Sequence, residues 1–164
     1  MTIRSHERIS RGELYESLAQ IVSTRSTCLR AQVGAVIIRD RRIISYGYNG
    51  APPGMPHCTD VGCLETTVYA EPIHASGADL SGVEVRIPGC ARAIHAEANA
   101  IAWAARAGIS VEGAELYCTH GPCLSCAQLM LSAGIKFAWW AEDYRDMRGA
   151  ELLRSAGVAS GSQR

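Results

Sequence analysis

The feature that most constrains this chain is a pair of short motifs, each at a point where a helix is expected to begin. His95-Ala96-Glu97 starts an alanine-rich helical segment, and Pro122-Cys123-Leu124-Ser125-Cys126 starts another. One histidine and two cysteines supply three zinc ligands and leave a fourth position open, which is typical of catalytic rather than structural zinc. A fold that uses both motifs together must bring two helix N-termini side by side.

Spacing within the motifs assigns different roles to their residues. Cys123 and Cys126 are three positions apart, so both sulfurs face one side of their helix. The helix N-terminus and a bound metal both favour thiolate over thiol. Glu97 lies two positions from His95, so we expect it to reach water on the metal and move protons rather than bind the metal. Alone, the cysteine pair could be a redox pair and His-x-Glu a helix cap, but together they favour a metal site.

The remaining pattern alternates strands and helices. Ser10 and Glu13 fit a capping box at the start of the first helix. The expected elements are a helix over 11–24, hairpin strands over 33–38 and 43–46, a helix over 94–107, a strand over 115–119, a helix over 123–133, a strand over 136–140 and a helix over 151–156. This order predicts one α/β domain over 1–164, with a central sheet between two layers of helices.

Two segments do not fit that alternation. Residues 50–92 are predicted to be a long loop, with a short helix near 64–75. A loop of this length in a compact domain is generally functional or tied down. The tail over 157–164 is polar and is expected to be frayed.

Composition excludes several classes of protein. Sixteen basic residues balance sixteen acidic ones, so neither a nucleic-acid surface nor a polybasic membrane anchor is expected. No apolar run approaches the length of a membrane span, and the first residues lack the apolar core of a signal peptide. Seven cysteines in a chain expected to be cytoplasmic point to metal binding or catalysis rather than disulfides.

Over residues 8–156 the chain resembles the deoxycytidylate (dCMP) deaminases of the cytidine deaminase superfamily. The matching stretches are Ser26–Arg30, Val33–Val36, Gly47–Gly50, Ile94–Ile101, Thr119–Cys126 and Glu142–Arg145. The pattern H-x-E followed by P-C-x-x-C is a signature of zinc deaminases. The resemblance implies a three-layer α/β/α sandwich of the cytidine deaminase type with a mixed sheet.

The implied activity is zinc-dependent hydrolytic deamination of dCMP to dUMP and ammonia. Zinc would lower the pKa of its water towards about 7, hydroxide would attack C4, and Glu97 would carry the protons. One alternative is a deaminase for a modified or free cytosine compound: 5-substituted dCMP, CMP, cytidine or an antibiotic intermediate. Another is a non-catalytic zinc scaffold, which would need the ligands but not Glu97.

The resemblance also implies substrate contacts. Asn49 would hold the 3′-hydroxyl of the sugar, although Asn-Gly alone is more typical of a turn. Backbone groups of Ala96 and Thr119 would bind the base. The 5′-phosphate would be held by Arg8, Arg30, Tyr144 and Arg145, since guanidinium groups match phosphate oxygens. Several relatives carry a histidine where this chain has Gly89, and His57 or His74 is expected to substitute for it.

Four further cysteines are expected to hold a second, structural zinc at the base of the long loop. These are Cys28, Cys58, Cys63 and Cys90, with His57 as an alternative ligand. A closed four-ligand site would clamp the loop. The opposing interpretation is a set of ordinary reduced thiols.

Further expectations concern assembly and the remaining residues. The resemblance implies a homo-oligomer, with a hexamer as the expected form, and dCTP and dTTP as allosteric effectors. Cys118 is expected to be a small buried hydrophobe. The three tryptophans are expected in the core or in a subunit interface, and His120 either lines the site or is satisfied by backbone.

Overall fold

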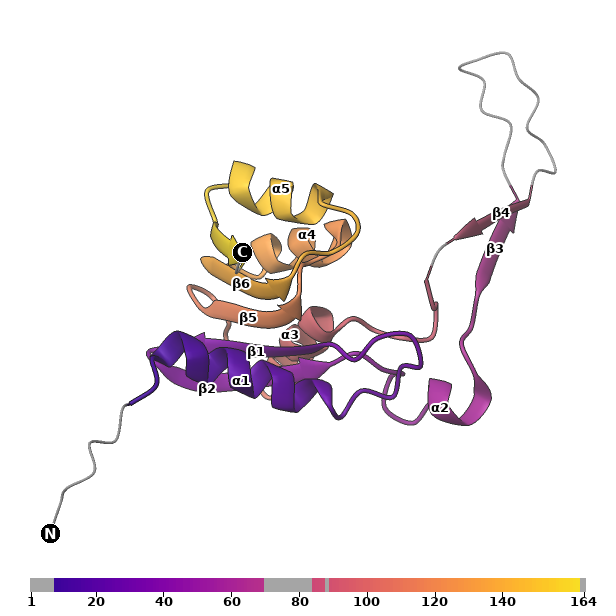
Figure 1. Cartoon of the computed structure of the whole chain (residues 1–164), viewed down its shortest axis with the longest axis horizontal. Coiled ribbons are helices and arrows are strands. Elements are labelled where there is room, and N and C mark those ends of the chain that lie inside the picture. Colours follow the sequence, from indigo (N-terminus) through magenta and orange to yellow (C-terminus); the bar gives the residue numbers. More distant parts are fainter. Residues whose placement is uncertain (1–7, 70–83, 88, 163–164) are drawn as a thin grey trace, which may run out of the picture.

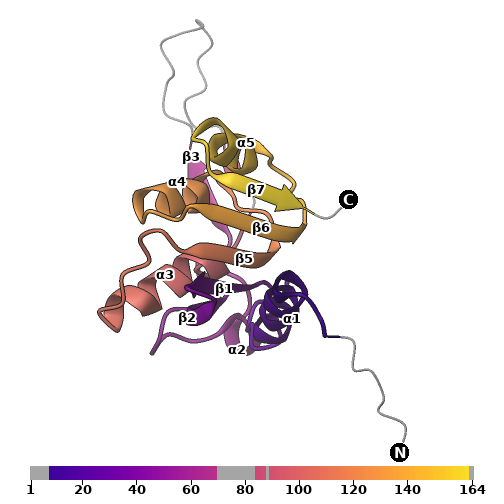
Figure 2. The ribbon, with the colours of Figure 1, turned by 90° about the vertical axis from the view of Figure 1, so that its left-hand side faces the viewer.

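A five-stranded mixed sheet forms the centre of the molecule (Figures 1 and 2). The computed structural model describes residues 8–69, 84–87 and 89–162. The strand order is β2-β1-β5-β6-β7; β1 is antiparallel to β2 and to β5, whereas β5, β6 and β7 are parallel. The strands are β1 Gly34–Arg39, β2 Arg42–Tyr48, β5 Glu115–His120, β6 Phe137–Glu142 and β7 Ala159–Ser162.

Helices cover both faces of this sheet, so the predicted three-layer architecture is confirmed. On one face, α1 (Arg11–Ser23) buries Tyr15 and Ala19 against alternate residues of β1 and β5. The other face is covered by α3 (Ala96–Arg106), α4 (Leu124–Ser132) and α5 (Arg148–Ser155). In Figure 2, α1 lies to the right of the strands, and α3 and α4 lie to the left. Each buried strand contributes apolar side chains to both faces, as the alternation of a pleated strand requires.

The capping box predicted for α1 is present. The Glu13 backbone N–H donates to Ser10 Oγ at 3.2 Å, and the Ser10 backbone N–H donates to a Glu13 carboxylate oxygen at 2.7 Å. The helix therefore begins where the sequence predicts, because two donors at its N-terminus are satisfied by side chains.

Close packing of α3 against β2 sets the position of His95. A Cβ on Gly47 would collide with the backbone of Ala100 and Ala96, so only glycine permits this approach. The Asn99 side chain donates to the Tyr48 carbonyl at 2.8 Å and fixes the register of helix and strand. The sequence predicts the helix and the strand separately. Their close approach depends on the small residues Gly47, Ala96 and Ala100.

The segment over 50–92 departs from the prediction. It contains a short helix, α2 (Cys58–Val61), and an antiparallel ribbon of β3 (Thr66–Tyr69) and β4 (Glu84–Ile87). The ribbon projects from the body in Figure 1. The helix predicted near 64–75 is wrong over its described part, because Thr66-Thr67-Val68-Tyr69 consists of β-branched and aromatic residues that favour strands. Residues 70–75 of that prediction lie outside the described residues.

The tail also departs from the prediction. Residues 159–162, expected to be frayed, form β7 and pair in parallel with β6. An edge strand needs little apolar character, because the backbone groups of β6 provide the pairing. The last helix begins at Arg148, three residues before the predicted start. Within the described residues, no helix combines the length and the apolar character needed to cross a membrane.

Candidate active site

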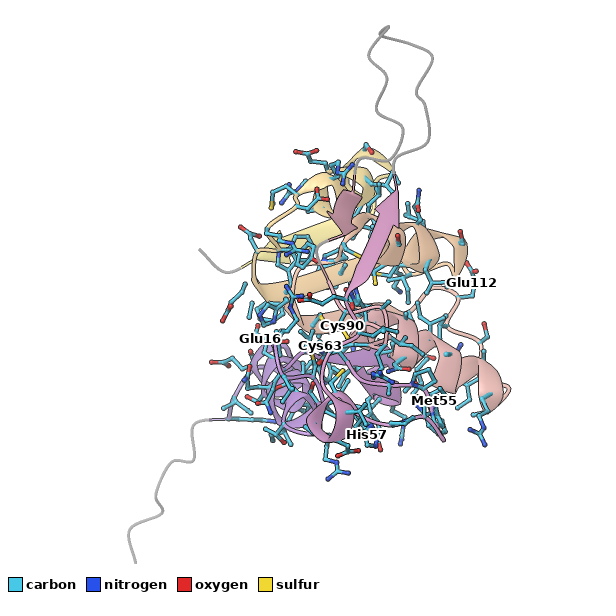
Figure 3. All side chains as sticks on the ribbon, turned by 90° about the vertical axis from the view of Figure 1, so that its right-hand side faces the viewer. Glu16, Met55, His57, Cys63, Cys90 and Glu112 are labelled. Atoms are coloured by element: carbon cyan, nitrogen blue, oxygen red, sulfur yellow. The ribbon has the colours of Figure 1, made fainter. Side chains whose placement is uncertain are left out.

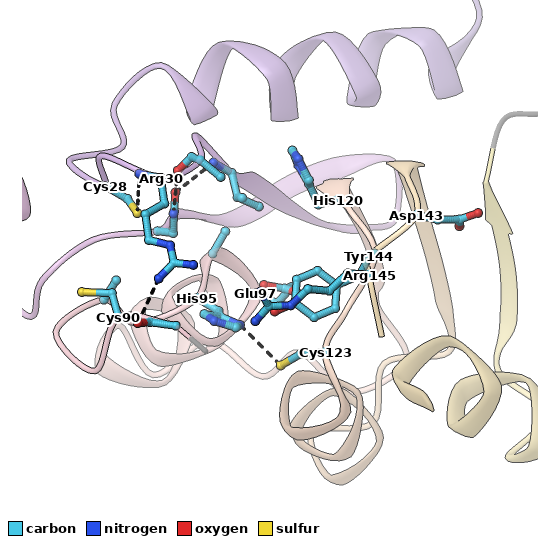
Figure 4. A pocket seen from close by; sticks show the side chains of 17 residues that line it. Cys28, Arg30, Cys90, His95, Glu97, His120, Cys123, Asp143, Tyr144 and Arg145 are labelled. Atoms are coloured by element: carbon cyan, nitrogen blue, oxygen red, sulfur yellow. Dashed lines mark hydrogen bonds between the residues drawn. The ribbon is translucent and has the colours of Figure 1, made fainter. Parts of the chain in front are cut away.

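Three predicted metal ligands converge at the start of two helices. His95 is the N-cap of α3, Cys123 is the N-cap of α4, and Cys126 lies in the first turn of α4. His95 Nδ1 lies 3.4 Å from Cys123 Sγ and 3.5 Å from Cys126 Sγ. Tetrahedral zinc, with its usual bond lengths to sulfur and nitrogen, separates such atoms by about 3.5 Å. The donor set and its spacing therefore fit zinc with three protein ligands. Figure 4 shows two of them, His95 and Cys123.

The local electrostatics favour a thiolate in this trio. Hydrogen bonds from Cys126 and His95 lower the pKa of Cys123 to about 4. The hydrogen bond with Cys123 and burial raise the pKa of Cys126. The hydrogen bond with Cys123 also raises the pKa of His95, because a thiolate stabilises the protonated imidazole that it contacts. One negative charge is thus already favoured at the site.

Glu97 lies in the first turn of α3, next to the ligands and not among them. Its side chain is buried, with 4% of the residue exposed. Burial raises the pKa of Glu97 to about 7. A carboxyl group with a pKa near the working pH can both take up and release a proton, as an acid–base catalyst must.

His95, Cys123 and Glu97 line one cavity of about 320 Å³ (Figure 4), and the buried Cys126 lies behind its wall. Its lining includes five of the predicted substrate residues: Arg30, Asn49, Ala96, Tyr144 and Arg145. The Arg145 guanidinium lies 5.6 Å from the centre of the Tyr144 ring, and Arg30 Nη1 donates to the Gly89 carbonyl at 3.1 Å. The cavity therefore combines a metal centre, a buried carboxyl group and two guanidinium groups.

Asn49 is part of a hydrogen-bond network in the cavity wall. Its Oδ1 accepts from Ser26 Oγ at 2.6 Å and from the Val33 backbone N–H at 2.8 Å, and its Nδ2 donates to the Ala31 carbonyl at 2.9 Å. These contacts hold the segment that carries Arg30. An amide nitrogen has two donors, so within the described part of the chain one N–H of Asn49 is left for a ligand.

Two predicted residues do not line the cavity. Arg8 is exposed near the start of the described chain. Thr119 is buried, and its Oγ1 accepts from the Gly34 backbone N–H at 3.2 Å. His74, named as a substitute for the missing histidine, lies outside the described residues.

The cavity also contains two residues to which the sequence assigned no definite role. His120 lines it at the end of β5 and lies 3.4 Å from the Glu142 carboxylate. Asp143 lines it as well and accepts from Trp140 Nε1 at 2.8 Å. Asp143 could have been found from the sequence, because it lies within Glu142–Arg145, a stretch that resembles the deaminase family.

A second group of thiols lies at the base of the ribbon. Cys58, Cys63 and Cys90 have sulfur atoms within 4.8 Å of one another, with 3.6 Å between Cys58 and Cys90. Figure 3 shows Cys63 and Cys90 close together. A tetrahedral zinc separates two bound sulfurs by about 3.8 Å, so the spacing fits. His57 instead places Nδ1 3.2 Å from Thr27 Oγ1.

Cys28 lies nearby but outside that trio. Its charge contributes to raising the pKa values of Cys58 and Cys63, for which burial is the largest cause, and the pKa of Cys58 reaches about 11. At Cys90 burial acts in the same direction, but backbone N–H donors outweigh it and lower the pKa to about 7. The group therefore contains one thiol that ionises readily, as metal binding requires.

Comparisons with known proteins agree with this geometry. A family model described as the cytidine and deoxycytidylate deaminase zinc-binding region matches residues 10–141. ComE operon protein 2 of Bacillus subtilis is 40% identical over 153 residues, covering 93% of this chain and 70% of the relative. The deoxycytidylate deaminase of Enterobacteria phage T4 is 34% identical over 167 residues, covering 86% of this chain and 83% of the relative.

A solved structure extends the similarity to the fold. The dCMP deaminase of cyanophage S-TIM5, in complex with dCMP and dUMP, superposes with a TM-score of 0.72 at 28% identity. The match covers 96% of this chain and 100% of that one.

Proposed function

The chain belongs to the cytidine and deoxycytidylate deaminase family, and on that premise we infer that it deaminates dCMP hydrolytically to dUMP and ammonia. Relatives named deoxycytidylate deaminase, and the similar structure that contains dCMP and dUMP, support this substrate. The observation that carries the proposal is the position of Glu97, buried beside three converging zinc ligands in a cavity with two arginines. A zinc scaffold without catalysis would not need that carboxyl group.

His95, Cys123 and Cys126 would hold the catalytic zinc. When bound, zinc supplies a Lewis acid that makes water nucleophilic near neutral pH. The cap positions of His95 and Cys123 are fixed by their helices, so the chain holds the ligands in place for the metal.

Glu97 moves the protons of the reaction. It takes one proton from the attacking water and delivers it to N3, while the water oxygen forms a bond to C4. The second proton reaches the exocyclic nitrogen, the bond from C4 to that nitrogen breaks, and ammonia leaves. Both transfers need a group that is protonated and deprotonated in turn, and the pKa of about 7 suits this requirement.

The remaining cavity residues bind the nucleotide. Arg30 and Arg145 contact the 5′-phosphate, since charged guanidinium groups form strong hydrogen bonds to phosphate oxygens. Tyr144 contacts the phosphate through its hydroxyl, which can donate a hydrogen bond. Asn49 uses its remaining amide N–H to donate to the 3′-hydroxyl, because its carbonyl oxygen already accepts two hydrogen bonds. The Ala96 backbone N–H, at the first helical position and outside the helix ladder, binds the base.

Cys58, Cys63 and Cys90 would hold a structural zinc, with Cys28 as the fourth ligand. The spacing of the three sulfurs supports the site, and Cys28, which lines the same cavity as Cys90, is proposed as the fourth ligand on the sequence pattern. Zinc bound there would tie α2 and the residues after the ribbon to the loop before β1.

The proposal also covers the oligomeric state of the chain and its cellular compartment. We propose a homo-oligomer, expected to be a hexamer regulated by dCTP and dTTP. Its association is supported by exposed apolar side chains around a groove beside β2, which include Ile43, Tyr46 and Trp103. Seven free thiols are consistent with a reducing compartment such as the cytoplasm.

A substrate panel tests the proposal. Ammonia release is measured with dCMP, CMP, dCTP, deoxycytidine and 5-methyl-dCMP at matched concentrations. We expect dCMP to have the highest kcat/KM and deoxycytidine to be much poorer. A higher kcat/KM with deoxycytidine than with dCMP would contradict the assignment, and preference for 5-methyl-dCMP would move it to a modified substrate.

A further inference from the structure

The thiol cluster and the substrate cavity share one wall. Cys90 belongs to the cluster of Cys58, Cys63 and Cys90, and it also lines the cavity. Its neighbour Gly89 lines the cavity too and accepts the hydrogen bond from Arg30 at 3.1 Å (Figure 4). A single peptide segment therefore connects the cluster to an arginine of the cavity.

Contacts of Cys90 and its neighbour Ala91 fix that segment on its cluster side. Cys90 Sγ lies 3.6 Å from Cys58 Sγ and accepts from the Leu64 backbone N–H at 3.3 Å. The Ala91 backbone N–H donates to the Leu64 carbonyl at 2.8 Å. The sulfur of Cys90 is thus a main anchor of the backbone at 89–91, and a metal bound by the cluster would strengthen that anchor.

Gly89 turns the chain so that its carbonyl faces Arg30. Its φ of +148° is a conformation that residues with a Cβ rarely adopt, although a Cβ there would meet nothing within 4 Å. The need for glycine is therefore conformational and not steric.

Arg30 is held at both ends by neighbours of the cluster. Its backbone N–H donates to Cys28 Sγ at 3.5 Å, and its guanidinium donates to Gly89. The residue is otherwise exposed, so without the carbonyl the long side chain would sample many rotamers. Ordering it on ligand binding would then weaken the binding of the phosphate.

We propose that the thiol cluster positions Arg30 through Cys90 and the Gly89 carbonyl, and so sets the affinity of the cavity for the 5′-phosphate. The inference rests on the proposed function, because it assumes a nucleotide in the cavity. Cys58, Cys63, Cys90 and Gly89 are positioning residues: they act on the phosphate through Arg30.

Calorimetric titration with dUMP and with deoxyuridine tests the proposal, since the two ligands differ by the phosphate alone. The phosphate preference is the ratio of the two dissociation constants. Arg30→Ala should lower this preference at least about tenfold, as loss of a charge-assisted hydrogen bond predicts. Cys63→Ser should lower it about three- to tenfold and reduce the zinc content from two to one per chain. The exposed Thr59→Ala, on α2 beside the cluster, is the matched control and should change neither quantity.

The double variant identifies the route. If the cluster acts through Arg30, Cys63→Ser should cost nothing further in the Arg30→Ala background, so the double variant should match Arg30→Ala within about twofold. Losses that multiply would overturn the proposal. So would a Cys63→Ser protein that has lost one zinc and keeps the wild-type phosphate preference.

Gly89→Ala keeps the test decisive should Cys63→Ser fail to fold. This change leaves every cluster sulfur in place, so zinc should stay at two per chain while the phosphate preference falls at least about threefold. An unchanged preference in Gly89→Ala would overturn the proposal. A wild-type protein that binds neither dUMP nor deoxyuridine would instead overturn the proposed function, and the coupling with it.

Discussion

Replacing Glu97 by glutamine separates proton transfer from metal binding. The substitution keeps the size of the side chain and removes its ability to take up a proton. Glu97 is 4% exposed and is not a predicted zinc ligand, so the trio of His95, Cys123 and Cys126 should keep its metal. The amide also avoids burying a charge, which favours a folded variant.

The expected loss of rate follows from the position of the carboxyl group. General acid–base catalysis contributes about 10²–10⁴-fold, which corresponds to roughly 3–5 kcal/mol of transition-state stabilisation. Glu97 carries two successive protons, and no other buried carboxyl group lies among the described lining residues. We therefore expect a loss in kcat at the upper end of that range for Glu97→Gln and for Glu97→Ala.

The assay is ammonia release from dCMP, accompanied by elemental analysis of zinc and by the dissociation constant for dUMP. Glu151→Gln, an exposed position in α5, is the matched control and should turn over dCMP at the wild-type rate. A zinc-loaded Glu97→Gln protein with kcat within tenfold of wild type would refute the role of Glu97.

Four further substitutions test phosphate binding, the second zinc site and the packing of α3 against β2. Arg145→Ala should lower kcat/KM for dCMP by about tenfold or more while affecting deoxycytidine much less, and equal losses on both substrates would argue against phosphate recognition. Cys28→Ser and Cys63→Ser should each reduce zinc from two to one per chain by elemental analysis; a single zinc in unchelated wild-type protein would eliminate the structural site. Gly47→Ala should lower the free energy of unfolding by about 1–3 kcal/mol in a denaturant titration, because the added Cβ collides with α3; an unchanged midpoint would show that the helix can move away.

Local sequence signals were sufficient for the parts of the fold that hold the catalytic ligands. The motifs at His95 and Cys123 mark helix starts, and the structure places both residues at N-cap positions. The capping box at Ser10 gives the start of α1 to the residue. Such signals work because caps and short spacings depend on neighbouring residues alone.

Signals that depend on distant pairing were not visible in the sequence. Strand β7 owes its structure to the backbone edge of β6, and its Ser-Gly-Ser sequence contains no apolar alternation. The ribbon of β3 and β4 joins segments separated by residues 70–83, so its register could not be predicted from either strand. The sequence also could not show that Gly89 supplies a carbonyl to Arg30, because that contact depends on a backbone conformation.

Conversion of dCMP by the protein with and without zinc shows whether this chain is a zinc-dependent dCMP deaminase. Purified protein is assayed for dUMP and ammonia as isolated, after removal of metal by a chelator, and after zinc is restored. We predict dUMP and ammonia in equal amounts from the isolated protein, loss of both on metal removal, and recovery of both with zinc. Full turnover by the metal-free protein, or no dUMP from the zinc-restored protein, would contradict this prediction.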